Sequence, residues 1–210
     1  ALSPSHEHHL YLQKHRHAIG NAILPLGALD NLTESLIVHG EKCLPHSQPW
    51  QVAIMRTNKK IACSAVLVHP QWVLSAAHCH WSSYTIQLGR HNLYAKHEPG
   101  SRTIRADFSV RHPRFTENPK RHDIMLIKLK EPVRESASIC TITMASQCTA
   151  PGTTCVTSGW GQLASGYFPR VLHCANVIVE TEEQCKAFYP ASYPGILCAG
   201  NRNTGANGCK

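Results

Sequence analysis

The segment between Cys63 and Cys79 restricts the fold of this chain more than any other. Two apolar runs, residues 65–68 and residues 72–74, flank a His-Pro-Gln turn, which predicts a strand, a turn and a second strand. If the two cysteines pair, the crosslink closes a loop of about 16 residues and contributes roughly 3 kcal/mol in the chain-entropy model. It would hold His78 at the end of a hairpin, where a general base needs a fixed position. The spacing alone leaves open that His78 is, like most of the fifteen histidines, a surface or hydrogen-bonded core residue.

Length and cysteine content bound the class of protein. The chain has 210 residues, ample for a buried core in one large or two small domains. Ten cysteines favour an oxidising compartment and hence a secreted, extracellular protein. None of them has the C-x-x-C spacing of a metal site, so neither a metal nor a cofactor is expected. No apolar run approaches the roughly eighteen residues of a membrane helix, so no membrane span is expected.

The formal net charge of +8 indicates which partners to expect. It favours acidic partners such as glycosaminoglycans or anionic membrane surfaces. The basic residues are scattered and have little aromatic interleaving, so nucleic acid is not an expected partner.

Residues 1–36 differ in character from the rest. The segment begins with Ala1 and is rich in histidine, which predicts a poorly ordered, propeptide-like leader; metal binding by these histidines is the weaker alternative. Glycine, asparagine and proline dilute the apolar stretch 18–29, so it is a poor signal peptide. Asn31 begins an Asn-Leu-Thr sequon for N-glycosylation. Residues 37–210 form the second predicted unit.

Short apolar runs separated by turns predict an all-β body for that unit. Further predicted strands are residues 52–55, 85–88, 103–110, 124–129, 171–174 and 177–179. Asp123 stands directly ahead of one of them, so it is either a partly buried carboxylate that needs a partner or a solvated turn residue. Thr181-Glu182-Glu183-Gln184 is a capping box, which predicts a short helix over residues 182–188.

Several motifs together resemble one family. They are Val66-Leu67-Val68-His69-Pro70-Gln71-Trp72-Val73-Leu74, His122-Asp123-Ile124, Ser158-Gly159-Trp160-Gly161 and Cys198-Ala199-Gly200. They resemble trypsin-like serine proteases, most of all tissue kallikreins, and the resemblance runs from Ile37 to Cys209. It implies two six-stranded antiparallel β-barrels of the chymotrypsin type, the second truncated. It also implies that His78 is the general base and that Asp123 fixes its tautomer.

The resemblance implies a disulfide pattern as well. The expected pairs are Cys43 with Cys174, Cys63 with Cys79, and Cys185 with Cys198. The cysteines expected to lack partners are Cys140, Cys148, Cys155 and Cys209.

The chain departs from the family at some functional positions. Leu36 and His39 differ at the expected activation site, and Ala65 replaces a glycine near the family's nucleophile. Asn207 stands at the base of the specificity pocket, where trypsin-like members carry Asp, so attraction of Lys or Arg would weaken. The family's Gly-Asp-Ser-Gly-Gly motif, which contains the nucleophile, does not occur in the 210 residues. The chain as printed is therefore expected to be inactive.

Two functions are compatible with these observations. The first is a secreted kallikrein-like serine endopeptidase, with protein or peptide substrates and protease inhibitors as partners. The alternative is a non-catalytic protease homologue that binds polyanions or partner proteins. The family also suggests a zinc effect, but the spacing fits no structural zinc site among the candidates His46, His91, His97 and Glu98.

Overall fold

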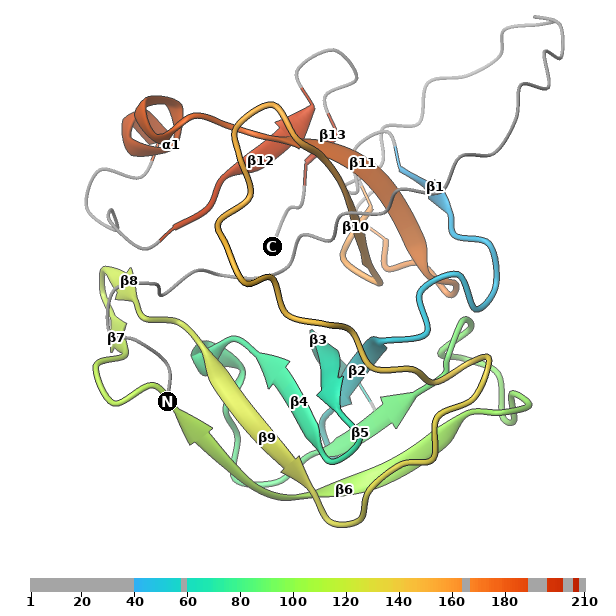
Figure 1. The fold of residues 1–210 in the computed structure, drawn as a ribbon. Coiled ribbons are helices and arrows are strands. Elements are labelled where there is room, and N and C mark those ends of the chain that lie inside the picture. Colours follow the sequence, from blue (N-terminus) through green and yellow to red (C-terminus); the bar gives the residue numbers. More distant parts are fainter. Residues whose placement is uncertain (1–39, 58–59, 164–166, 189–195, 202–205, 208–210) are drawn as a thin grey trace, which may run out of the picture.

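Six antiparallel strands form a closed barrel, the lower half of the molecule in Figure 1. The structure is a computed structural model that describes residues 40–57, 60–163, 167–188, 196–201 and 206–207. Around the barrel the strand order is β2-β3-β4-β9-β6-β5. Their bounds are β2 (Gln51–Met55), β3 (Ile61–His69), β4 (Trp72–Ser75), β5 (Thr85–Leu88), β6 (Arg102–Arg111) and β9 (Met125–Leu129).

Alternating side chains explain why these segments are strands. In β5 and β9 every second residue is buried, as expected for a sheet with one face on the core. The large, fully buried side chains that the barrel strands contribute are Met125 and the aliphatic residues Val52, Ile54, Leu67, Val73, Ile86, Leu88, Ile127 and Leu129. The predicted runs lie within one residue of these strands, except that β3 starts at Ile61, four residues earlier than predicted.

A second, five-stranded sheet lies above the barrel in Figure 1. Its strands are β1 (Glu41–Lys42), β10 (Thr154–Gly159), β11 (His173–Val179), β12 (Ala199–Asn201) and β13 (Ala206–Asn207). The prediction of two strands over residues 171–174 and 177–179 was wrong, because β11 is continuous and pairs with β10 from His173 to Ile178. Asn176 is exposed between buried neighbours, so its polar side chain fits the outward pleat without interrupting the strand.

Helices are few and short. The 3-10 helix η1 (Ala77–Cys79) follows β4, and α1 (Glu182–Phe188) has the predicted bounds. The capping box of α1 is present: Thr181 N–H donates to Gln184 Oε1 at 2.8 Å, and Gln184 N–H donates to Thr181 Oγ1 at 3.3 Å. Among the described residues no helix is long and apolar enough to cross a membrane.

Barrel and sheet are joined by packing and by one long connection. A cluster that includes Ala53, Met55, Trp160 and Leu172 packs between them, and the Ser158 hydroxyl donates to Gln51 Oε1 at 2.7 Å. The connection from β9 to β10 runs up between the two units in Figure 1. Backbone hydrogen bonds at residues 140 and 142 tie it to the barrel on the way.

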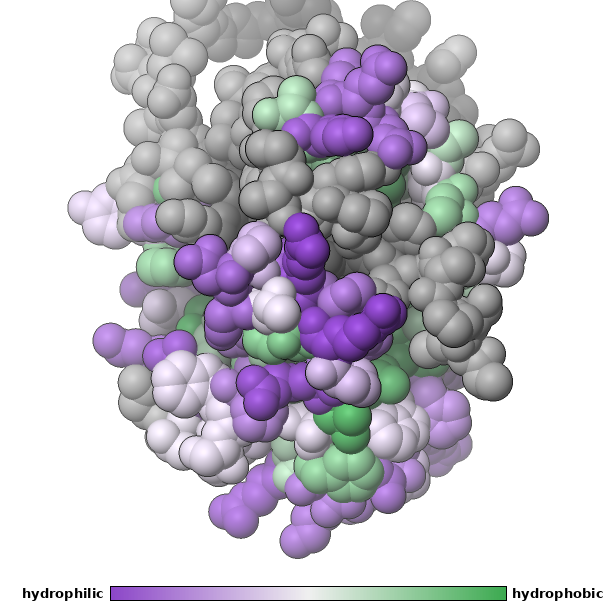
Figure 2. All heavy atoms as spheres, turned by 90° about the vertical axis from the view of Figure 1, so that its left-hand side faces the viewer, coloured by the Kyte–Doolittle hydropathy of each residue, from purple (hydrophilic) through white to green (hydrophobic). Residues whose placement is uncertain are grey.

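The hairpin of β7 (Thr116–Glu117) and β8 (Lys120–Arg121) stands apart at one side. Figure 2 views this side and shows a mainly hydrophilic surface with a narrow hydrophobic band below its centre. All four residues of the two strands are exposed, so the stability of the hairpin does not come from apolar burial.

Candidate active site

His78 occupies the middle of η1, directly after the strand that the sequence predicted. The Cys63–Cys79 disulfide ties the end of η1 back to β3, with Cα atoms 6.1 Å apart. The adjacent Ala77 and Cys79 are buried, whereas the His78 side chain is 41% exposed. The backbone that carries the imidazole is therefore fixed by buried neighbours, while the ring itself is accessible to solvent.

Asp123 contacts His78 because the neighbouring strands β4 and β9 carry the two residues near the same end of the barrel. Strands β4 and β9 are paired, with Ser75 opposite Met125. This pairing brings His78, three residues after Ser75, beside Asp123, two residues before Met125. Asp123 Oδ2 lies 2.6 Å from His78 Nδ1, and Oδ1 accepts a hydrogen bond from the His78 backbone N–H at 2.8 Å. The Asp123 side chain is only 6% exposed, which is the partly buried alternative raised by the sequence.

This contact defines what the imidazole can do. A carboxylate at Nδ1 favours the tautomer with the proton on that nitrogen, which leaves Nε2 as the atom able to accept a proton. The carboxylate also stabilises the imidazolium that forms when it does so. His78 and Asp123 thus have the geometry of a general base and its positioning group.

Three disulfides connect the cysteine pairs that the resemblance implies. They are Cys43–Cys174, Cys63–Cys79 and Cys185–Cys198. The first joins the residue that follows β1 to β11, so it crosslinks two neighbouring strands of the second sheet. Cys140 is half-buried and has no disulfide within the described residues.

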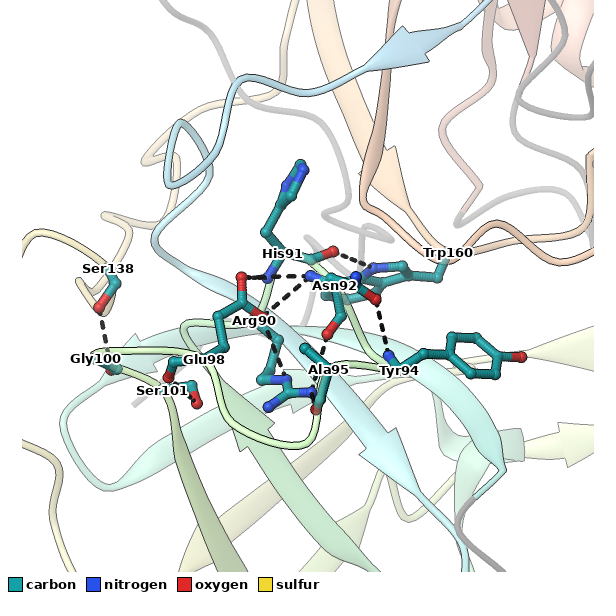
Figure 3. A network of polar contacts seen from close by, with 10 residues as sticks. All are labelled: Arg90, His91, Asn92, Tyr94, Ala95, Glu98, Gly100, Ser101, Ser138 and Trp160. Carbon is teal, nitrogen blue, oxygen red and sulfur yellow. Dashed lines mark hydrogen bonds and ion pairs between the residues drawn. The ribbon is translucent and has the colours of Figure 1, made fainter.

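A second polar cluster, absent from the sequence predictions, lies in the loop after β5 (Figure 3). The Glu98 carboxylate accepts backbone N–H groups of His91 at 2.9 Å and Asn92 at 3.1 Å, and it lies 3.5 Å from Arg90 Nε. The His91 carbonyl in turn accepts a hydrogen bond from Trp160 Nε1 at 3.1 Å, which fastens the loop to the sheet. Local backbone contacts of this kind leave no periodic signal in a sequence.

The same cluster contains two of the residues considered for zinc. Both Glu98 oxygens are already engaged by backbone donors and Arg90, so the carboxylate serves the loop. Burial lowers the pKa of His91, partly opposed by the Glu98 charge, which is consistent with a neutral imidazole. In the described residues, three ligating side chains meet only at Cys63, His78 and Cys79, where both sulfurs belong to a disulfide.

The other predicted residues are placed as follows. Ala65 lies fully buried in β3 and lines a cavity of about 800 Å³ between the barrel and β10. Asn207 lies in β13, where its backbone pairs with Gly200. Asn31, Leu36, His39 and Cys209 lie outside the described residues, as does the whole segment 1–36.

Comparison with known proteins identifies the class to which this fold and site belong. The sequence model of the Trypsin family matches residues 37–210, and the chain belongs to that family of trypsin-like serine proteases. Within it the similarity is to kallikreins. Human (Homo sapiens) kallikrein-4 is 50% identical over 184 residues, which are 87% of this chain and 72% of the relative. Rat (Rattus norvegicus) kallikrein-8 is 39% identical over 196 residues, covering 89% and 74%.

A solved structure supports the same conclusion on the fold. Neuropsin, a serine protease expressed in the limbic system of mouse brain, superposes with a TM-score of 0.72 at 36% identity. The match covers 79% of this chain and 75% of that one. The all-β chymotrypsin fold is thereby confirmed, with one closed six-stranded barrel present.

Proposed function

We propose that this chain is the greater part of a secreted, kallikrein-like serine endopeptidase in which His78 is the general base and Asp123 its positioning residue. The observation that carries the proposal is the double contact of Asp123 with His78, at 2.6 and 2.8 Å. It is the arrangement that acyl transfer by a serine nucleophile requires of its base. Family membership supplies the reaction class, and protein or peptide substrates fit that class.

The domain plan follows from the same proposal. Residues 1–36 form the leader and residues 37–210 belong to the protease unit. The five-stranded sheet is part of a second barrel of six strands, whose remaining strands and serine would come from a segment after residue 210 in a longer form. The cavity between barrel and β10 is where such a segment would pack, and Ala65 and Ser158 both line it. Three disulfides support an extracellular location.

The 210 residues alone, we propose, hydrolyse no peptide bonds, because they do not include the serine or oxyanion-hole segment of the family. Loss of the nucleophile costs a serine protease on the order of a millionfold in turnover, and the residual rate depends on the oxyanion hole. Protein inhibitors that mimic substrates would be partners of the extended form only.

The test compares residues 37–210 with the same protein extended by a kallikrein tail that contains Gly-Asp-Ser-Gly-Gly. A fluorophosphonate probe should label the extended protein and leave the shorter one unlabelled, and His78→Ala should abolish labelling of the former. Labelling of the shorter protein would show that another residue is the nucleophile. In the extended protein Asn207→Asp should raise the preference for Lys or Arg; an unchanged preference would exclude Asn207 from the specificity pocket.

A further inference from the structure

A surface cavity of about 520 Å³ lies beside β6, away from the cavity under the sheet. Its cause is a change of strand partner. The β5–β6 ladder ends with the pair Thr85 and Arg105, whereas β6 continues along β9 as far as Arg111. Residues 80–84 lead from η1 toward β5 and line the space opposite residues 105–109 of β6. The volume is within the range of roughly 300–1,000 Å³ that holds small ligands.

Two aromatic side chains give this cavity apolar walls. Trp81 is 44% exposed and Phe108 is 47% exposed, and both rings border the cavity, so their apolar surface is accessible to a ligand. The guanidinium of Arg56 lies 4.0 Å from the centre of the Trp81 ring, and Lys128 Nζ lies 5.5 Å from that of Phe108. Each aromatic wall therefore has a cation beside it.

The remaining lining is polar and rich in hydroxyl groups. Ser82, Ser83, Ser109 and Thr57 supply hydroxyls that can both donate and accept hydrogen bonds. Tyr84 lies at the buried side of the cavity, and its hydroxyl has no hydrogen-bond partner of ordinary geometry among the described residues. Burial raises the pKa of Tyr84, an effect that Ser109 partly offsets, so the phenol stays a protonated donor. Hydroxyl-rich polar surface between aromatic walls suits a sugar better than an apolar ligand.

The lining carries one cation and one carboxylate, and the cations Arg56 and Lys128 over its aromatic rings make the surroundings of the cavity positive in balance. Arg105 lines it, is exposed, and has no ion-pair partner in the part of the chain that the structure describes. Asp107 is the acidic residue of the lining, and Lys128 lies 3.9 Å from it and compensates its charge. An unpaired guanidinium prefers an oxyanion that it can bind through two parallel hydrogen bonds.

We propose that this cavity binds a sulfated saccharide unit, with the sugar ring between Trp81 and Phe108 and a sulfate group on Arg105. The net charge of +8 on the chain would favour the approach of such a polyanion. A bare inorganic anion would leave the aromatic walls without a function, and nucleic acid would require a longer basic track. The inference does not depend on the proposed catalytic pair, since none of the residues that carry it is His78 or Asp123.

The test measures binding of the 210-residue protein to a heparin tetrasaccharide by titration calorimetry. We expect binding, and at least about tenfold weaker binding of the desulfated tetrasaccharide. Arg105→Ser should weaken binding about tenfold, because it removes a charge-assisted contact. The matched control Arg134→Ser removes an equal charge from an exposed position outside the cavity and should change the dissociation constant less than about twofold.

Two further variants separate the sugar contact from simple charge attraction. Trp81→Ala should weaken binding several-fold with no change in net charge, whereas Tyr94→Ala, at an exposed tyrosine elsewhere, should not. Asp107→Asn should tighten binding, because the charge of Lys128, which lies 3.9 Å from the carboxylate, would no longer be compensated. Circular dichroism and thermal unfolding establish that each variant is folded. If Trp81→Ala is not, Arg105→Lys, which keeps the charge but loses the two-pronged contact, should still bind more weakly.

Three results would overturn the proposal. Equal losses in Arg105→Ser and Arg134→Ser would mean diffuse electrostatic binding. Equal affinity for polyglutamate of matched charge would mean a site for acidic peptides. Displacement of the tetrasaccharide by an equal concentration of inorganic sulfate would mean a simple anion site.

Discussion

Asp123 contacts both the backbone and the ring of His78: Oδ1 accepts the His78 amide at 2.8 Å, and Oδ2 lies 2.6 Å from Nδ1. One carboxylate thus fixes the position of η1 as well as the orientation of the imidazole. The orientation of the imidazole and the local fold depend on the same side chain, so a change there has two separable effects.

The first prediction concerns the structural effect. Asp123→Ala should lower the free energy of unfolding by about 1–3 kcal/mol, because the partly buried His78 amide loses its acceptor. Urea unfolding followed by tryptophan fluorescence measures this. Asp107→Ala, which removes a half-exposed carboxylate 3.9 Å from Lys128, should change stability by less than about 1 kcal/mol. Equal effects would mean that Asp123 contributes nothing specific to the fold.

Two glycines with positive φ allow a clean comparison. Gly100 has φ +77°, and an added Cβ would lie 2.5 Å from the Ser138 hydroxyl oxygen; Gly152 has φ +82° and nothing within 4 Å. Gly152→Ala should cost about 1 kcal/mol from backbone strain alone. Gly100→Ala should cost more by about 1–2 kcal/mol, since Ser138 must move and its 3.1 Å hydrogen bond to the Gly100 carbonyl is disturbed. Thermal unfolding of the two variants measures the difference in stability between them. The double variant Gly100→Ala/Ser138→Ala should lose less stability than Gly100→Ala and Ser138→Ala together, because the hydroxyl that the new Cβ would meet is gone.

The contribution of each disulfide to the stability of the protein should depend on the length of the loop that it closes. Cys63–Cys79 spans 16 residues and Cys43–Cys174 spans 131. In the chain-entropy model their removal costs about 3 and about 5 kcal/mol respectively. Replacing each pair by alanines and comparing urea midpoints tests the order. A larger loss at Cys63–Cys79 would show that its main contribution is to the native state, where it holds η1.

Stability should fall in mild acid because of His91. Its pKa is lowered in the folded protein, mainly by burial, so the unfolded chain takes up a proton first, near the ordinary value of 6.5. Stability is therefore fully present above about pH 6.5 and declines below it, until the lowered folded pKa is also passed. The loss of stability between pH 7.5 and 5.5 should be smaller in His91→Gln than in the unchanged protein. His97→Gln, at an exposed histidine of the same loop, should leave the loss unchanged; an equal reduction in both variants would contradict the assignment.

Strands with strict alternation were predictable from sequence, and those shaped by pairing partners were not. Residues 85–88 and the helix 182–188 have their predicted bounds because alternation and a capping box are local signals. The early start of β3 escaped prediction because residues 61–64 are only half-buried, and their extended form comes from pairing with β2. The continuity of β11 was missed because its exposed Asn176 resembles a break.

The same distinction applies to the sites. The contact of His78 with Asp123 was expected because the segments around both residues resemble motifs of the trypsin-like family. The Arg90–Glu98 cluster was not expected, because it consists mainly of contacts to the backbone of a loop. The cavity beside β6 was not expected either, because it lies where β6 stops pairing with β5 and continues along β9. Neither has a repeating pattern along the chain.

The position of β9 in the barrel has a consequence for synthesis on the ribosome. β9 is the last barrel strand to emerge, yet it lies between β4 and β6, so until it arrives both of these strands have an open edge. The nascent chain cannot seal its barrel before residue 129 has left the exit tunnel. Asp123 lies two residues ahead of β9, so the pairing of β9 with β4 also brings the carboxylate close to His78. Closure of the barrel and assembly of the His78–Asp123 pair therefore depend on the same segment of the nascent chain.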